Sequence, residues 1–375
     1  MLNLGVEYTW LDVLCLRQKG GTCDSERLRV EEWKLDVPTI GAVYGGDRVV
    51  IYMSGLGRPL TLKEGDLQSD RCWFRRAWTV QEVGRRRIIA GDMPDGPLHA
   101  EPIDKDDTGM LAKFHLQLQV IDSIHYLSQP LFLSAGMFGV LSEMQNRVST
   151  NPVDKVAGVA APLVSYMIPA YHETESLEDA WTALVNVMLL GNRGELFFWY
   201  PEPGDAGKKW RPSWEQVMNK CLPVNRISAM VVGRDDETEE DWYEGLCVEK
   251  GFVRGLAVGS MGQDNRCGEL IVKHTNGTEH TFSIIARHGY PILEDTYTLL
   301  GMDPAATEDK FAWIRWMRID QAAVRSEIRI QYWVIGRKLP DEKFEKVSVF
   351  EMANEDEVGR LSLLDITEQR RTILV

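Results

Sequence analysis

Three residues that lie close together in the chain have side chains that could do chemistry as a group. Arg75, Trp78 and Glu82 are spaced i, i+3 and i+7, so on an α-helix they would share one face two turns long. On that face an indole can form a stacking wall and lower the local dielectric, a guanidinium can hold a phosphate, and a partly desolvated carboxylate can stabilise positive charge or accept a proton. The spacing therefore indicates a small-molecule site in which Glu82 is the reactive group.

A simpler interpretation makes Glu82 a solvated surface charge. Arg85 and Arg86 lie three and four residues after it, so ion pairs on an exposed helix face would account for all three charges. Such surface pairs contribute little to stability, about 0–1 kcal/mol each. The residue types alone favour this simpler interpretation, and the catalytic one needs support from other motifs.

Short β-rich runs alternate with helical patterns in the N-terminal part of the chain. Strands are expected at residues 6–16, 47–57 and 86–92. The first is apolar enough to be buried on both faces of a parallel sheet, with Asp12 near its carboxyl end. Residues 25–44 have helical spacing in which Pro38 starts a new helix or bends the old one. This order of elements predicts a parallel α/β layer.

Two regions of different character follow. Residues 106–245 are mostly helical and include a Pro- and Trp-rich loop whose aromatic side chains need burial. In residues 246–375 apolar and polar residues alternate, and Asn276-Gly277 between two such runs is a strong hairpin signal. We therefore expect an α/β domain over residues 1–105, then the helical region, then a β-rich antiparallel sheet or barrel.

The composition disfavours several classes of protein. The chain has 375 residues, 44% of them hydrophobic, and a net charge of -14 that would repel nucleic acid and anionic lipid. Its six cysteines include no CxxC pair, its seven histidines include no HExxH, and it has no glycine-rich phosphate loop and no GxSxG turn. We find no signal peptide and no apolar run long enough to span a membrane. We expect a cytoplasmic globular protein with reduced thiols, no metal, no cofactor, and no nucleic-acid or membrane partner.

Three blocks of sequence occur in an order that is typical of a known family. They are YTWLDVLCLRQ at residues 8–18, VPTIGAVYGGDRVVIYMSG at residues 37–55 and RAWTVQE at residues 76–82. Together they resemble the successive blocks of the fungal heterokaryon-incompatibility domain family. Two later stretches, residues 147–163 and 197–214, resemble the extension of a mushroom subgroup, so the likeness spans most of the chain.

The resemblance implies an enzymatic activity. The family is similar to Toll/interleukin-receptor domains, whose enzymatic members split NAD at the nicotinamide glycosidic bond. Their catalytic glutamate lies in a Trp-Cys-x-x-Glu pattern, which residues 78–82 match except for Thr79, so the resemblance gives Glu82 the catalytic role. Cleavage passes through an oxocarbenium-like ribose that an adjacent carboxylate can stabilise. NAD would then be a substrate and no cofactor would be needed.

The resemblance also implies a substrate pocket around Glu82. Trp78 would shape the pocket, Asp12 would lie at the carboxyl edge of its strand, and the loop with Gly55 and Gly57 would run beside the site. The candidates for phosphate contact are Arg58, Arg75 and Arg76.

One family block is missing from this sequence. The family usually begins with an earlier strand and a loop carrying a Ser-x-x-Trp-Gly-like motif, which does not precede residues 6–16. We therefore expect an incomplete Toll/interleukin-receptor-like parallel sheet. Either the 6–16 strand closes against a neighbour, or a segment from elsewhere in the chain or from another chain fills the gap.

Three functions stay open at this point. The first is an NAD-cleaving enzyme of fungal self/non-self recognition, which would act in programmed cell death. The second is a noncatalytic interaction module that retains the fold and binds protein partners or itself. The third is a biosynthetic enzyme that uses the aromatic residues of the later regions to hold an apolar small molecule.

Overall fold

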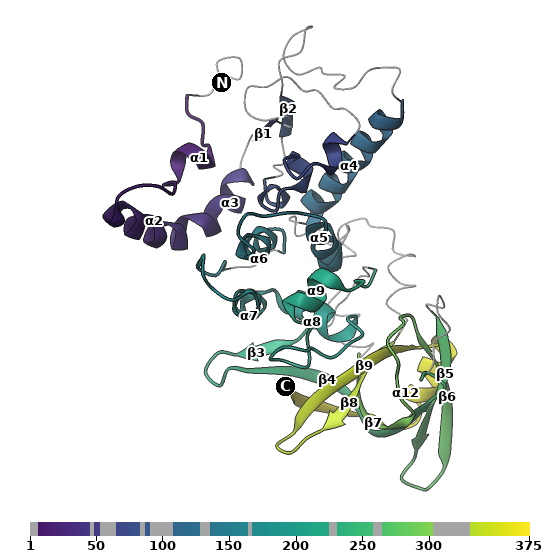
Figure 1. Cartoon of the computed structure of the whole chain (residues 1–375). Coiled ribbons are helices and arrows are strands. Elements are labelled where there is room, and N and C mark those ends of the chain that lie inside the picture. Colours follow the sequence, from purple (N-terminus) through teal and green to yellow (C-terminus); the bar gives the residue numbers. More distant parts are fainter. Residues whose placement is uncertain are drawn as a thin grey trace. The chain divides into compact units, whose positions relative to one another are not determined.

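The computed structural model divides the chain into two compact units, drawn as ribbons in Figure 1. It describes residues 7–45, 49–52, 65–82, 87–90, 108–127, 136–163, 167–224, 231–257, 265–302 and 331–375. The first unit comprises Met1–Ala135 and Gly139–Met188, and the second comprises Gly136–Phe138 and Leu189–Val375. The two units are defined by contacts in space and not by sequence character. The three regions expected from the sequence therefore stay a prediction.

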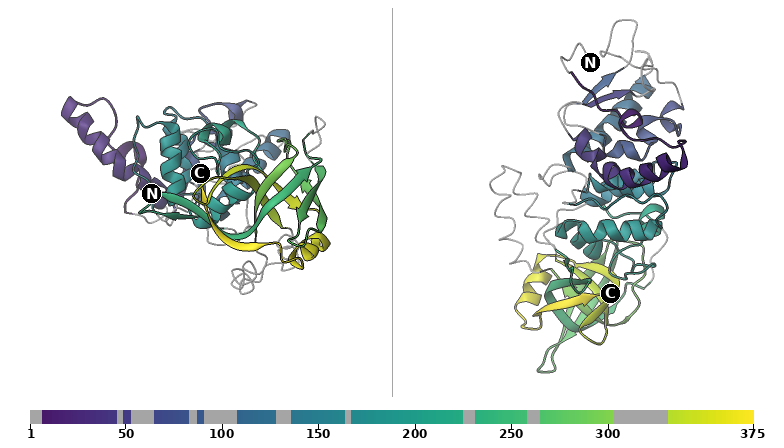
Figure 2. Two further views of the ribbon diagram at one scale, coloured as in Figure 1. Left: turned by 90° about the horizontal axis from the view of Figure 1, so that it is seen from below. Right: turned by 90° about the vertical axis from the view of Figure 1, so that its left-hand side faces the viewer.

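Helices form the N-terminal part of the first unit. The one-turn helix α1 (Asp12–Cys15) is followed by α2 (Cys23–Asp36), which extends outward from the rest of its unit in Figure 1 and in the left view of Figure 2. The 3-10 turn η2 (Val37–Thr39) and the helix α3 (Ile40–Tyr44) come next. The break expected at Pro38 is thus confirmed, because proline is tolerated in a first helical turn and disrupts a helix interior.

The parallel sheet of the first unit has two strands in the described residues. β1 (Val49–Tyr52) and β2 (Arg87–Ala90) pair directly with each other. The strand expected at residues 6–16 is wrong, because α1 forms there and Tyr8 and Leu14 are 87% and 80% exposed. A central parallel strand would be buried on both faces, so the apolar run was misinterpreted.

The expected fold class is therefore also wrong. An incomplete Toll/interleukin-receptor-like α/β domain needs a parallel sheet as its main layer, whereas the large sheet of the described chain is antiparallel and belongs to the second unit. The described residues form a mixture of helices followed by a β-rich C-terminal half.

The helix expected around Glu82 is replaced by short turns. After η3 (Asp66–Gln68) come the 3-10 turns η4 (Trp73–Arg75) and η5 (Trp78–Val80). Arg76 between them is extended, with φ -79° and ψ 135°, so η4 and η5 do not merge into one helix. The shared two-turn face inferred from the spacing of Arg75, Trp78 and Glu82 is wrong.

The helical patterns after these turns are confirmed. The helices are α4 (Thr108–Leu127), α5 (Gly136–Gln145), α6 (Val153–Ala160) and α7 (Leu177–Val187). The Ser176 hydroxyl accepts a hydrogen bond from the backbone N–H of Asp179 at 3.1 Å, which satisfies one of the free donors at the start of α7. Local capping chemistry therefore fixes where this helix begins.

In its described residues the second unit combines three helices with an antiparallel sheet that closes on itself. Its elements are α8 (Leu190–Phe198), α9 (Trp214–Asn219), β3 (Gly233–Asp235), β4 (Glu240–Arg254), β5 (Arg266–Lys273), β6 (Glu279–Ala286), β7 (Asp295–Gly301), β8 (Tyr332–Lys338), β9 (Lys343–Met352), α12 (Glu355–Ser362) and β10 (Glu368–Leu374). The strand order is β10-β4-β5-β6-β9-β8-β7, and an additional pairing of β4 with β7 closes the ring. The hairpin expected at Asn276-Gly277 joins β5 to β6, and Gly277 adopts a φ of 88° that favours glycine.

Large apolar side chains fill the inside of this closed sheet. They include Val253, Leu270, Phe282, Ile284, Leu299, Trp333 and Ile335, which are all fully buried. The Pro- and Trp-rich loop is ordered, as expected, with Trp210 fully buried and Trp214 3% exposed. Most of the aromatic content of this unit therefore packs a core.

A buried lysine joins α8 to β9. The Lys346 ammonium donates hydrogen bonds to the backbone carbonyls of Phe197 (2.7 Å), Tyr200 (2.6 Å) and Leu196 (3.3 Å). Burial lowers the pKa of Lys346 well below its usual value. The three carbonyls oppose this effect, because they lie where the negative end of the α8 dipole favours a cation. Lys346 thus satisfies backbone acceptors that the helix itself leaves free.

His288 makes the second unit sensitive to acid. Its Nε2 donates to the Val349 carbonyl at 2.8 Å, and burial lowers the pKa of His288 from 6.5 to about 4. The unfolded chain binds a proton at His288 below about pH 6.5, whereas the folded chain does so only near pH 4. The contribution of neutral His288 is complete above pH 6.5, and up to about 3 kcal/mol of it is lost as the pH falls toward 4.

This acid sensitivity can be measured by urea unfolding at pH 7 and pH 4.5. The variant His288→Gln keeps a donor for the Val349 carbonyl and cannot titrate in this range. We expect the wild-type chain to lose more stability than the variant between the two pH values. Equal losses in both proteins would contradict the assignment.

Candidate functional site

A cleft of about 900 Å³ lies in the first unit. It is lined by α1 and the residues that follow it, and by single residues of α2, η2 and α3. The rest of its lining comes from Asp70, Arg71, Arg76, Ala77, Trp78, Glu82, Val148, Ser149, Thr150, Asn151, Asp154, Tyr171 and Glu173. Its volume falls within the range of small-molecule sites, about 300–1,000 Å³. The cleft is therefore large enough to hold a nucleotide.

The structure brings four of the sequence-predicted site residues together in this cleft. They are Asp12, Arg76, Trp78 and Glu82. Arg75 does not line the cleft, and its guanidinium lies 3.5 Å from the Asp70 carboxylate. Gly55, Gly57 and Arg58 lie outside the described residues, so their roles stay predictions.

The environment of Glu82 shifts the pKa of its carboxyl group. Its carboxyl group is half-buried and accepts a hydrogen bond from the Trp73 indole N–H at 3.2 Å. The pKa of Glu82 is raised to about 7. Burial is the main cause and the charge of Asp12 adds to it, while Arg76, the Trp73 hydrogen bond and Arg147 act in the opposite direction. Near neutral pH this carboxyl group can both hold and release a proton, as a general acid or base must.

Backbone contacts with a distant segment place the turn that leads to Glu82. Arg76 and Val148 form a parallel bridge, in which the Ala77 N–H donates to the Val148 carbonyl at 2.9 Å and the Val148 N–H donates to the Arg75 carbonyl at 2.6 Å. Gly158 of α6 lies so close beneath that an added Cβ would be 3.1 Å from the Ala77 carbonyl oxygen. The extended Arg76 is thus held by packing, against any local preference for helix.

Aromatic side chains form one wall of the cleft. Tyr171 lies between Trp33 and Trp78, with ring centroids 6.1 Å apart in each pair. Beneath this wall the Tyr171 hydroxyl donates to Asp154 at 2.7 Å, and the Trp78 indole donates to the same carboxylate. Asn151 in turn donates to the Tyr171 hydroxyl at 3.0 Å. These polar groups satisfy one another, so they fix the orientation of the aromatic wall.

Sequence reasoning assigned Trp78 to the pocket but missed Trp33, Tyr171 and the polar groups that contact them. Asn151 and Asp154 occur in the 147–163 stretch that resembles the mushroom extension, but no chemistry was assigned to them. Burial raises the pKa of the Asp154 carboxyl, whose residue is 9% exposed. An aspartate three residues after an asparagine, in a helical pattern that is otherwise mostly apolar, is the signal that could have pointed to a buried polar cluster.

The cations of the cleft differ in how they are engaged. Lys19 pairs with Glu173, which also pairs with Arg29 outside the cleft lining. Arg71 and Arg76 are exposed at the cleft, and within the described residues neither side chain forms an ion pair. Guanidinium groups that are exposed in a cleft can bind a phosphate by charge-assisted hydrogen bonds.

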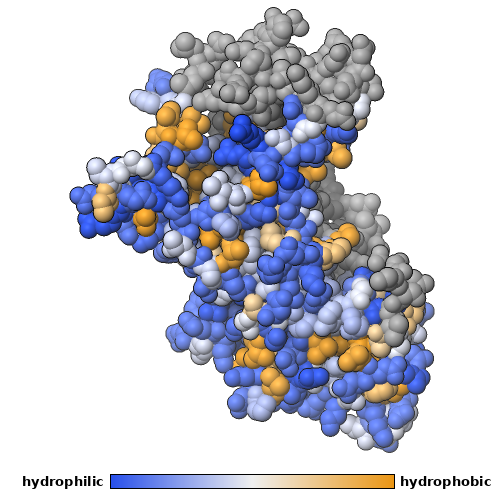
Figure 3. Space-filling model, viewed as in Figure 1, coloured by the Kyte–Doolittle hydropathy of each residue, from blue (hydrophilic) through white to orange (hydrophobic). Residues whose placement is uncertain are grey.

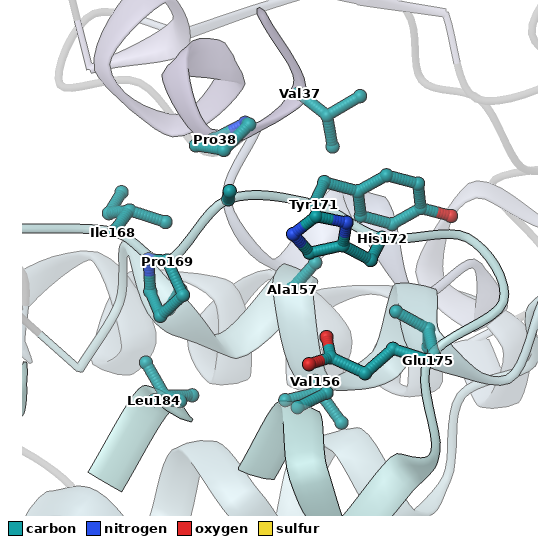
Figure 4. A pocket seen from close by; sticks show the side chains of 14 residues that line it. Val37, Pro38, Val156, Ala157, Ile168, Pro169, Tyr171, His172, Glu175 and Leu184 are labelled. Carbon is teal, nitrogen blue, oxygen red and sulfur yellow. The ribbon is translucent and has the colours of Figure 1, made fainter. Parts of the chain in front are cut away.

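A second, much smaller cavity shares Val37 and Tyr171 with the lining of the cleft (Figure 4). It holds about 30 Å³, and apolar side chains such as Val37, Pro38 and Leu184 line most of it, together with His172 and Glu175. Burial raises the pKa of Glu175. This cavity is too small for a nucleotide, which leaves the large cleft as the candidate site.

Other chemistry-bearing groups do not add a second candidate site. Within the described ranges, no three His, Cys, Asp or Glu side chains are close enough together to hold a metal ion. All six cysteines are free thiols. Among the helices of the described residues, none combines the length and the apolar character needed to cross a bilayer.

No protein-family model, curated protein or solved structure matches the chain. The cleft and the sequence blocks are therefore the features from which a function is inferred.

Proposed function

We propose that the chain cleaves the nicotinamide glycosidic bond of NAD in the large cleft, with Glu82 as the reacting carboxylate. The observation that carries the proposal is the half-buried Glu82 carboxyl group, which lines the cleft and has a pKa raised to about 7. A carboxyl group in this state is unusual on a protein surface and is characteristic of sites that do acid–base or charge-stabilising chemistry.

The reaction requires only water and the dinucleotide. The bond between the nicotinamide nitrogen and the ribose C1′ breaks, and its electron pair leaves with the neutral nicotinamide. The ribose then carries positive charge, which the ionised Glu82 carboxylate stabilises directly or by accepting a proton from a ribose hydroxyl. Addition of water at C1′ gives ADP-ribose and releases one proton.

The other cleft residues have binding roles in this proposal. Arg71 and Arg76 would contact the pyrophosphate, and Trp78 would stack against a ring of the substrate. Asp12 would act through its charge, by holding the pKa of Glu82 near neutrality. The sequence blocks at residues 8–18, 37–55 and 76–82 support extending the proposal to heterokaryon-incompatibility proteins and fungal self/non-self recognition.

A second candidate function is a noncatalytic interaction module. The observation that favours it is the exposed apolar surface over α1, seen in Figure 3, where Val13 is 53% and Leu14 80% exposed. Exposed apolar groups of this kind are common at protein–protein contacts. The biosynthetic alternative gains no such support, because tryptophans such as Trp181, Trp210 and Trp333 are fully buried in cores.

The proposal is tested by incubating the purified chain with NAD between pH 5 and pH 9 and measuring nicotinamide. We expect release whose rate rises with pH and levels off above about pH 8, because the ionised form of Glu82 is the active one and its pKa is about 7. An ordinary exposed glutamate would give a flat profile above about pH 5.5. No release at any pH, together with concentration-dependent self-association, would overturn the proposal in favour of the interaction module.

A further inference from the structure

A buried hydroxyl and a buried guanidinium lie directly beneath the turn that leads to Glu82. The Thr79 side chain is fully buried, and its oxygen lies 2.6 Å from the Trp73 carbonyl and 2.7 Å from the Arg76 carbonyl. The same oxygen accepts a hydrogen bond from Nη1 of Arg147 at 2.5 Å. A hydroxyl has one proton to donate, so Thr79 binds one of these carbonyls while it accepts from the guanidinium.

Arg147 reaches the same turn from the end of α5. Its Nη1 also donates to the Arg76 carbonyl at 2.9 Å, and its Nε and Nη2 donate to one carboxylate oxygen of Glu143 at 3.2 and 3.0 Å. The side chain is fully buried. A buried ion pair costs desolvation and often adds nothing to stability compared with apolar residues, so stability alone does not explain its place beneath a cleft.

We propose that Thr79 and Arg147 are a positioning pair that holds the turn from Trp73 to Val80, and thereby fixes the Glu82 carboxyl group in the cleft. The catalytic meaning of this inference rests on the proposed function. The Thr79 hydroxyl contacts the Trp73 carbonyl and accepts from Arg147, which also donates to the Arg76 carbonyl. The Trp73 indole in turn donates to Glu82. Loss of the hydroxyl would therefore release both the turn and the indole that orients the carboxyl group.

Arg147 also acts on Glu82 through its positive charge. The groups that face Glu82 are Asp12 of α1, Tyr44 of α3, and the two cations Arg76 and Arg147. Arg147 is the buried cation of this set, and its charge lowers the pKa of Glu82 less than that of Arg76 does. Because a nearby cation favours an ionised carboxyl, removing Arg147 should raise the pKa of Glu82.

Thr79 is where this chain departs from the Trp-Cys-x-x-Glu pattern, and its contacts give that residue a role. A hydroxyl is a good donor to a carbonyl and a good acceptor from a guanidinium, whereas a thiol does both weakly. Valine has the shape of threonine without the hydroxyl, and serine keeps the hydroxyl, so the pair Thr79→Val and Thr79→Ser separates the hydrogen bonds from the packing.

The test uses the full chain with its glutamate side-chain carboxyls labelled with carbon-13. Glu82 is identified as the NMR signal that is absent from Glu82→Gln. We expect Arg147→Met to move the titration midpoint of Glu82 upward by roughly 0.5–1 pH unit.

We also expect Thr79→Val to lower kcat for nicotinamide release by about 10- to 100-fold with KM nearly constant. Thr79→Ser should restore kcat to within about threefold of wild type.

The matched control is Thr39→Val, which removes a hydroxyl that donates to the Asp36 carbonyl on the surface of η2. It should change neither the midpoint nor kcat. An unchanged Glu82 midpoint in a folded Arg147→Met, or unchanged kcat in Thr79→Val, would overturn the inference. If Arg147→Met does not fold, the Val and Ser variants still decide it. If wild type releases no nicotinamide, the proposed function fails, and the inference is then decided by whether Thr79→Val shifts the Glu82 titration and Thr79→Ser does not.

Discussion

Replacing Glu82 by glutamine is expected to lower kcat for nicotinamide release by at least about 100-fold. Glutamine keeps an oxygen that can accept the Trp73 hydrogen bond of 3.2 Å, but it has no charge to stabilise the ribose cation and no basic site for its proton. Folding should hardly change, because the substitution removes a carboxyl group whose burial is already unfavourable. We expect the melting temperature to stay within about 2 °C of wild type.

Glu175→Gln is the matched control for this variant. Glu175 is also a glutamate of the first unit whose pKa is raised by burial, but it lines the small cavity and not the large cleft. Its glutamine variant should retain nicotinamide release. A well-folded Glu82→Gln with full activity would rule out Glu82 as the reacting carboxylate.

Replacing Lys346 by methionine is expected to destabilise the second unit by about 2–4 kcal/mol. Methionine fills a similar volume but leaves the carbonyls of Leu196, Phe197 and Tyr200 without their donor, and each orphaned buried acceptor costs about 1–3 kcal/mol. Relief from burying an ammonium offsets part of this cost. Calorimetry should show a melting temperature that is roughly 5–15 °C lower.

Lys273→Met, at the exposed end of β5, provides the control for a change from lysine to methionine. It should shift the melting temperature by less than about 2 °C. A Lys346→Met chain as stable as wild type would show that the three carbonyls find other donors, and that the lysine does not hold α8 to β9.

The parts of the fold that could be predicted from the sequence depend on short-range chemistry. The break at Pro38, the Ser176 cap and the Asn276-Gly277 hairpin each follow from one or two residues and their immediate neighbours. The prediction of a strand at residues 6–16 was wrong because an apolar run shows that residues are hydrophobic but does not show whether other parts of the chain cover them. In the structure Leu14 of that run is 80% exposed.

The prediction of a helix leading to Glu82 was wrong for a related reason. A helix was a reasonable choice for residues 75–82, but Arg76 is held extended by Val148, a partner that sequence spacing cannot show. Trp78 and Glu82 still line one cleft, as expected, and Asp12 reaches the cleft from a one-turn helix in place of a strand end.

Buried charges were the hardest features to foresee. The acidic run at residues 233–245 has the composition of a solvated loop, but it forms the hairpin of β3 and β4. Within this hairpin Asp241 is 1% exposed and accepts a hydrogen bond from Arg193 at 2.5 Å. Arg147 was missed in the same way. A charged residue is by default assigned to the surface, and only its distant partner shows that it is buried.

The pairing of β4 with β10 has a consequence for how the chain is made. β4 runs antiparallel to β10 over seven residue pairs, from Glu368 opposite Cys247 to Leu374 opposite Asp241. The two strands are far apart in sequence, and a nascent chain folds from its N-terminus as residues leave the ribosome. The first unit and most of the closed sheet can form while translation continues, but one side of β4 must wait, unpaired, until β10 is synthesised. During that interval β4 presents a free strand edge, so slowing translation late in the message should increase aggregation of the nascent protein.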